Sequence, residues 1–79
     1  MHPIKFAYYD LANAIVEQAA IDYRNALNGV SYDRRYSPES VIKETEKFFR
    51  SEWYRTLTNV DGEYLIANLK KEHKEKEQI

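Results

Sequence analysis

The stretch FFRSEWYRTLTNVDGEYLI, residues 48–66, is the part of this chain that decides its fold. It gathers aromatic side chains around two arginines, breaks at a polar turn, and then becomes apolar again. Apolar positions recur at helical spacing before and after the turn, which indicates two helices joined by a short connection. The stretch therefore marks the centre of the core and also a candidate binding surface.

The helix before the turn has the clearest start in the sequence. Ser37 supplies a hydroxyl cap, Pro38 occupies the first helical position, and Glu39 is an early acid. Apolar positions then follow a helical stripe, which predicts a helix over residues 38–57 that is either unbroken or kinked near Ser51. The charged side chains predicted on the opposite, solvent-facing side are Lys43, Glu44, Glu46 and Lys47.

A first helix is predicted over residues 9–28 from apolar positions three and four residues apart. Asp10 is placed to open this helix, and Gly29 supplies the left-handed residue at which helices often stop. Neither end of the chain has a run of apolar positions at helical spacing that would hold it on the core. We therefore expect residues 1–7 and 73–79 to be frayed.

A third helix is predicted over residues 61–76, with Thr58 or Asp61 as its cap. The fold class is therefore all-α. We expect a small three-helix bundle in which the second and third helices form an antiparallel helical hairpin that closes over the first. No internal repeat or linker divides the chain, which indicates a single helical domain over residues 1–79.

Composition excludes several classes of protein. The chain has 79 residues and no cysteine, so it has neither a disulfide framework nor a thiolate metal site. It contains no apolar run typical of a signal peptide, and none near the roughly 20 residues that span a bilayer. Its formal net charge of -1 gives no global field that would attract nucleic acid or an anionic membrane. We expect a cytoplasmic protein with no membrane insertion.

The sequence lacks the patterns of a catalytic or metal site. His2 and His73 lie near opposite ends, and there is no phosphate loop, paired-histidine zinc motif or nucleophile elbow. Asp61, Gly62 and Glu63 resemble part of a calcium loop but lack its alternating ligands, so a capped turn is the favoured interpretation. We expect no enzyme activity, no cofactor and no metal.

Two surfaces are candidates for binding. Buried Trp, Tyr and Arg carry most of the binding energy at protein interfaces, which favours a partner-binding set consisting of Arg50, Trp53, Tyr54 and Arg55. Phosphate binding and base stacking need a basic and aromatic mixture. The candidate nucleic-acid set is Arg34, Arg35 and Tyr36, with Arg50 and Arg55 as further members of one patch.

The placement of the aromatic residues decides between core and surface. Helical spacing puts Phe48 and Phe49 in the core and favours the core for Trp53 too, whereas an interface role would leave Trp53 exposed. The tyrosines that this spacing leaves outside the core are Tyr8, Tyr9, Tyr32, Tyr36 and Tyr54. They either seal the ends of a small bundle or belong to an interface.

The strings ANAIVEQAAIDYRNAL, residues 12–27, and FFRSEWYRTLTNVDGEYLI resemble short uncharacterised (hypothetical) proteins of prophages and integrative elements in Gram-positive bacteria. The resemblance implies a cytoplasmic setting and a mobile-element origin, and it carries no catalytic residue. We therefore expect a non-enzymatic protein-interaction module, a homo-oligomer such as a homodimer, that modulates host or defence machinery through a protein partner. The alternative is a nucleic-acid-binding accessory protein that uses an arginine and aromatic patch.

Overall fold

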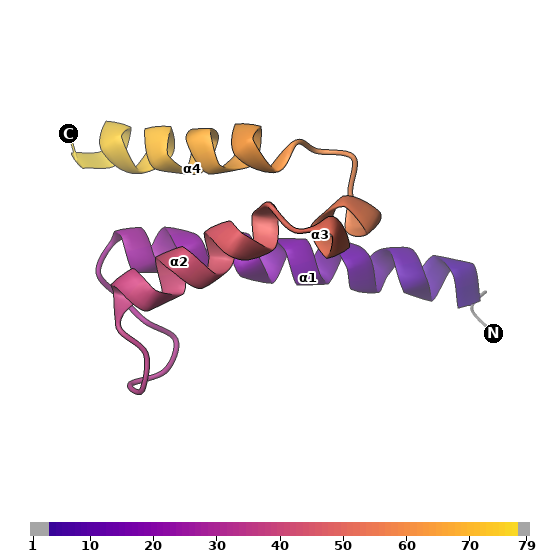
Figure 1. Ribbon diagram of the computed structural model, residues 1–79, viewed down its shortest axis with the longest axis horizontal. Coiled ribbons are helices and arrows are strands. Elements are labelled where there is room, and N and C mark those ends of the chain that lie inside the picture. The colour runs from indigo at the N-terminus through magenta and orange to yellow at the C-terminus, as the bar shows by residue number, and fades with distance from the viewer. Residues whose placement is uncertain (1–3, 78–79) are drawn as a thin grey trace.

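The computed structural model describes residues 4–77, and these residues form helices joined by turns, with no strand among them. The helices are α1 (Ile4–Leu27), α2 (Pro38–Phe49), α3 (Glu52–Leu57) and α4 (Gly62–Glu77) (Figure 1). The all-α prediction is confirmed. The predicted frayed ends lie in part outside the described residues, namely at 1–3 and 78–79.

The bounds of α1 differ from the prediction at one end only. The helix begins at Ile4, so the predicted start at residue 9 and the opening role of Asp10 are wrong. At the other end Gly29 has a φ of 81°, as predicted for a left-handed stop. Its amide donates to the Ala26 carbonyl at 2.9 Å and the Val30 amide donates to the Asn25 carbonyl at 2.8 Å, the pair of bonds of a Schellman motif.

The predicted second helix is interrupted, which confirms the kinked alternative. α2 ends at Phe49 and α3 begins at Glu52, because Ser51 adopts an extended conformation with φ -82° and ψ 161°. The Ser51 hydroxyl accepts a hydrogen bond from the Tyr54 amide at 3.1 Å and so caps α3. Ser37 caps α2 in the same way through the Ser40 amide, as predicted.

The helices pack around one shared interior. α1 contacts each of the other three helices, and α2 also contacts α3 and α4. In Figure 1, α2 runs opposite to α1, and the chain passes through α3 before α4 returns across the molecule. The turn between α3 and α4 therefore lies at one end of α2, and the loop between α1 and α2 lies at the other.

The core is aromatic at its centre. Tyr23, Phe49 and Tyr54 are the largest fully buried side chains, and each pair of neighbours meets edge to face: the ring centroids are 5.9 Å apart for Tyr23 and Phe49 and 5.7 Å for Phe49 and Tyr54. Phe48 packs against this cluster while partly buried. The predicted core positions of Phe48 and Phe49 are thus confirmed.

Two neighbouring residues exchange the places that their spacing predicted. Tyr54 is 1% exposed, so its placement outside the core is wrong, and Trp53 is 57% exposed rather than buried. The cause is the break at Ser51. A helix that continued from α2 would turn residue 53 inward, four positions after Phe49, but the restart at Ser51 resets the phase and turns residue 54 inward instead.

Candidate functional site

A pocket of about 470 Å³ lies where the end of α3 meets the start of α4. The side chains that line it and carry chemistry are Arg50, Tyr54, Arg55, Asp61 and Glu63. Its volume falls within the range of small-molecule sites in proteins, roughly 300–1,000 Å³. The pocket is therefore large enough to hold a small molecule.

The Tyr54 hydroxyl is the buried polar group of this pocket. Its oxygen is shielded from solvent and has no hydrogen-bond partner in the protein. Burial, and secondarily the negative charge of Asp61, raises the pKa of Tyr54, so the hydroxyl keeps its proton at neutral pH. The Tyr54 ring packs against Phe48 and Phe49, and Tyr54 contributes to the pocket lining although solvent does not reach its hydroxyl oxygen.

The turn between α3 and α4, which lines the pocket, is held by local hydrogen bonds. The Asp61 carboxylate accepts from the Glu63 amide at 3.2 Å, and the Asp61 carbonyl accepts from the Leu65 amide at 3.0 Å. The predicted capping role of Asp61 and the helix start near residue 61 are thus confirmed. The other candidate cap, Thr58, instead accepts from the Val60 amide at 3.2 Å within the turn.

Gly62 is required by a close approach of two backbones. A β-carbon at this position would lie 2.0 Å from the carbonyl oxygen of Phe49, well inside contact distance. The start of α4 therefore packs directly onto the end of α2, which brings Asp61 and Glu63 beside Arg50 and Tyr54. The sequence marked Gly62 only as a helix break, so this packing role was not predicted.

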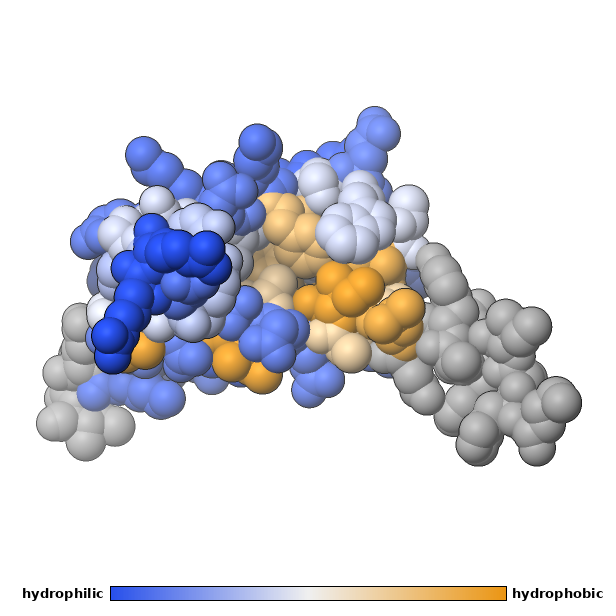
Figure 2. All heavy atoms as spheres, turned by 90° about the horizontal axis from the view of Figure 1, so that it is seen from below, coloured by the Kyte–Doolittle hydropathy of each residue, from blue (hydrophilic) through white to orange (hydrophobic). Residues whose placement is uncertain are grey.

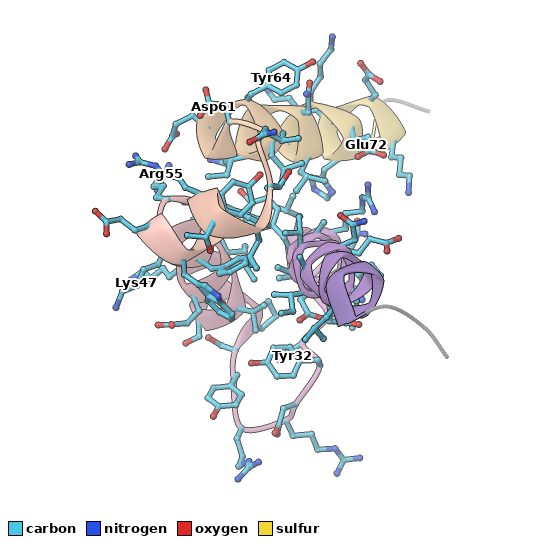
Figure 3. All side chains as sticks on the ribbon, turned by 90° about the vertical axis from the view of Figure 1, so that its right-hand side faces the viewer. Tyr32, Lys47, Arg55, Asp61, Tyr64 and Glu72 are labelled. Carbon is cyan, nitrogen blue, oxygen red and sulfur yellow. The ribbon has the colours of Figure 1, made fainter. Side chains whose placement is uncertain are left out.

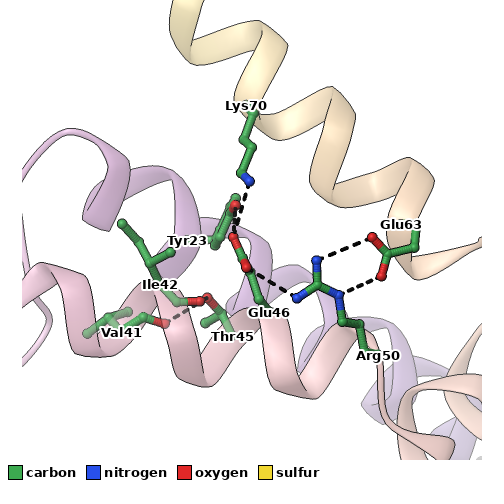
Figure 4. Close-up of polar contacts among 8 residues, drawn as sticks. All are labelled: Tyr23, Val41, Ile42, Thr45, Glu46, Arg50, Glu63 and Lys70. Atoms are coloured by element: carbon green, nitrogen blue, oxygen red, sulfur yellow. Dashed lines mark hydrogen bonds and ion pairs between the residues drawn. The ribbon is translucent and has the colours of Figure 1, made fainter.

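Arg50 is held on two sides by carboxylates (Figure 4). Its guanidinium forms a bidentate pair with Glu63, with the second N–H to oxygen distance at 3.3 Å, and it also lies 3.3 Å from Glu46. Glu46 in turn accepts a 2.6 Å hydrogen bond from the Tyr23 hydroxyl and lies 3.5 Å from the Lys70 ammonium. These contacts join α1, α2 and α4 in one polar network.

The polar network shifts the pKa values of its two carboxylates. Burial by itself raises the pKa of Glu46, but the Tyr23 hydrogen bond and the charges of Lys70 and Arg50 together lower that pKa below its usual value. The hydrogen bond from Arg50 lowers the pKa of Glu63. Both carboxylates are therefore ionised at neutral pH. Glu46 was predicted on the solvent side, and its position between three helices corrects that prediction.

Arg55 and Asp61 are the two charged side chains of the pocket that form no ion pair with another described residue. Arg55 comes from α3 and Asp61 from the residue before α4, and Figure 3 shows both on the same side of the molecule. The Arg50 and Glu63 charges neutralise each other, so the pocket presents one available cation and one available anion.

The structure divides the predicted partner-binding set. Arg50, Tyr54 and Arg55 line the pocket, whereas Trp53 does not. Trp53 instead lies against Phe48, with ring centroids 5.3 Å apart and planes at 72°, and exposes its other side to solvent. The four residues therefore contribute to two different features, the pocket and an exposed aromatic surface.

The predicted nucleic-acid residues lie elsewhere. Arg34, Arg35 and Tyr36 are in the loop between α1 and α2, at the end of α2 that is far from α3 (Figure 1). Arg35 pairs with Asp33 at 2.9 Å, and hydrogen bonds from Arg35 lower the pKa of Asp33. The structure therefore does not bring these loop residues into one patch with the arginines of the pocket.

No protein-family model matches the chain, and no curated protein or solved structure matches it. The resemblance to prophage and integrative-element proteins therefore stays a prediction. Among residues 4–77, no helix is both long enough and apolar enough to cross a membrane. Within the same part of the chain, no three acidic or histidine side chains gather as they would around a metal ion.

Proposed function

We propose that this protein is a non-enzymatic interaction module that self-associates through the surface around Trp53. The observation that carries the proposal is the 57% exposure of Trp53. Tryptophan is enriched among the residues that dominate interface energetics, and its exposure in a monomer leaves a large apolar area in water.

Trp53 is also held in place before any partner arrives. Its edge-to-face contact with Phe48 and the short, capped α3 fix the ring on the bundle. A side chain that is already ordered loses less conformational entropy on binding, so more of the burial energy contributes to affinity. Rigid aromatic anchors of this kind are typical of protein interfaces.

The same end of the molecule carries further apolar surface. α1 extends past the other helices at the end where α3 lies (Figure 1). Leu11 of α1 is 60% exposed. Figure 2 shows apolar side chains gathered on the face seen from below, on the same side of the molecule. A chain of this size buries only about 60% of its unfolded surface, so a second copy that covers this face would add the apolar burial that one copy lacks.

The predicted three-helix arrangement is part of this proposal. We take α1, α2 and α4 as the predicted three-helix bundle, with α2 and α4 as its antiparallel hairpin, and α3 as the short insert that presents Trp53. Cytoplasmic location, a mobile-element origin and modulation of host or defence machinery through a further protein stay predictions. So does nucleic-acid binding by Arg34, Arg35 and Tyr36.

Light scattering over a wide range of protein concentration tests the proposal. The expected result is a dimer at high concentration that Trp53→Ala abolishes. Tyr64→Ala is the matched control, because Tyr64 is a comparably exposed aromatic residue on α4. A monomer at every concentration, or a dimer that Trp53→Ala leaves intact, would overturn the proposal.

A further inference from the structure

We propose that the Asn28 and Gly29 pair, which directly follows α1, is a site of spontaneous deamidation that the folded helix end protects. The inference does not depend on the surface around Trp53. It combines three observations: the sequence of the pair, its exposure to water, and the hydrogen bond that the Gly29 amide makes in the fold.

The residue after Asn28 makes this asparagine reactive. Asparagine is among the thermolabile residues of proteins. Of the asparagines in this chain, only Asn28 is followed by glycine, whereas Asn25, for example, is followed by alanine. Glycine has no β-carbon to hinder the approach of its backbone nitrogen, and its backbone rotates more freely than that of other residues. We therefore expect Asn28 to be the most reactive asparagine of the unfolded chain.

The reaction replaces the side-chain amide by an acid. The backbone nitrogen of Gly29 gives its proton to water or hydroxide and forms a bond to the side-chain carbonyl carbon of Asn28, and the side-chain nitrogen leaves as ammonia. Water then opens the resulting cyclic imide at either carbonyl. The product is aspartate or isoaspartate, in which the main chain runs through the β-carbon. Asn28 and Gly29 are both exposed, so water reaches the site.

The fold holds the nitrogen that must react. The Gly29 amide donates to the Ala26 carbonyl at 2.9 Å as part of the cap that ends α1. While this bond is made, the nitrogen is fixed in the cap and its proton is shared with a carbonyl, so it is not available to the Asn28 side chain. The reaction therefore requires the end of α1 to open, and helix ends open locally more often than the whole protein unfolds.

The product weakens the same cap. It places a negative charge at the C-terminal end of α1, where the helix dipole disfavours anions. Isoaspartate also lengthens the main chain between Asn28 and Gly29. Both bonds of the Schellman motif span this point, since they run from the Gly29 amide to Ala26 and from the Val30 amide to Asn25. A chain that has been modified once therefore closes this end of α1 less well.

Incubation of the full chain at neutral pH, either folded or unfolded in guanidinium chloride, tests the inference. Mass spectrometry of tryptic peptides follows Asn25 and Asn28 together, because both lie on the peptide 25–34. In the unfolded chain, we expect Asn28 to deamidate several-fold faster than Asn25. In the folded chain, Asn28 should react at least about tenfold more slowly than in the unfolded chain. Equal rates in either comparison would overturn the inference.

Two further measurements identify the cause. Gly29→Ala, followed in guanidinium chloride so that its effect on the fold does not matter, should slow the reaction of Asn28 to a rate close to that of Asn25. Hydrogen exchange of the Gly29 amide in the folded chain should be slowed about as much as deamidation is. An unchanged rate in Gly29→Ala, or an unprotected Gly29 amide, would contradict the assignment.

The effect on the cap is measured on the product. Chains deamidated at Asn28 in denaturant and then refolded should melt at a lower temperature than the parent. The Asn28→Asp variant carries the charge without the longer main chain, so it should melt between the two. A deamidated chain as stable as the parent would contradict the proposed effect on the helix end.

Discussion

Replacing either buried tyrosine by phenylalanine removes a single hydroxyl from the same aromatic core. We expect the two replacements to have different effects on the free energy of unfolding. Tyr23 and Tyr54 are 0% and 1% exposed, and both rings pack edge to face on Phe49. Phenylalanine preserves these ring contacts. The two variants therefore differ only in what each hydroxyl contacts, which is Glu46 for Tyr23 and no protein group for Tyr54.

Tyr23→Phe should lower the free energy of unfolding by about 2 kcal/mol. Hydrogen bonds to charged groups contribute roughly 1.5–3 kcal/mol, and this bond is short at 2.6 Å. For a chain of this length the loss corresponds to a fall in melting temperature of about 8–16 °C. Glu46 keeps its contacts with Arg50 and Lys70, so the carboxylate is not left unpaired and the loss stays within this range.

Tyr54→Phe should leave the free energy of unfolding unchanged or raise it by up to about 1 kcal/mol. The variant removes a buried group that has lost water and gained no protein partner, and replacing such a group by an apolar one of the same shape is near neutral or stabilising. Urea unfolding and thermal melts followed by circular dichroism measure both variants. A Tyr54→Phe variant as unstable as Tyr23→Phe, or a neutral Tyr23→Phe, would refute this reasoning.

Three further predictions concern the backbone and the polar network. Gly62→Ala should destabilise the fold by about 1–3 kcal/mol in urea unfolding, because its β-carbon would overlap the Phe49 carbonyl oxygen; full stability would contradict this packing. Ser51→Ala should cost about 1 kcal/mol in the same assay through loss of the α3 cap, and an unchanged midpoint would count against it. The lowered pKa of Glu46 contributes stability above its unfolded pKa of about 4.3, and this is lost as pH falls through the lower folded pKa. Melts from neutral to acid pH should therefore show Glu46→Gln less stable than the parent at neutral pH and less sensitive to acid; parallel curves would argue against the network.

The helix ends that a single local side chain determines can be predicted from the sequence. Gly29 ends α1 and Ser37 begins α2 because each fixes its own backbone, whatever the rest of the chain does. The sequence does not reveal the start of α1, because no acidic residue stands in its first turn and Asp10 offers a capping residue further along the chain. Ser51 was recognised as a site where a kink could occur, but the sequence did not establish the break.

The candidate site depends on features that the helical spacing of apolar residues does not predict. The restart at Ser51 shifted the helical phase by one position, which exchanged Trp53 and Tyr54 between core and surface. The Tyr23 and Glu46 pair is separated by 23 positions, and no local pattern connects such residues. Arg50 and Glu46, four positions apart on one helix face, form the one contact of the network that spacing could have indicated.

We propose that Trp53 is a surface residue that becomes buried when two copies meet. Its fluorescence measures this burial directly, because it is the only tryptophan in the chain. The emission maximum and its quenching by iodide are followed together over a range of protein concentration. We expect a solvent-exposed, readily quenched Trp53 in dilute solution, and a blue shift with protection from iodide as dimers form. A shielded, blue-shifted Trp53 in a strict monomer would contradict it.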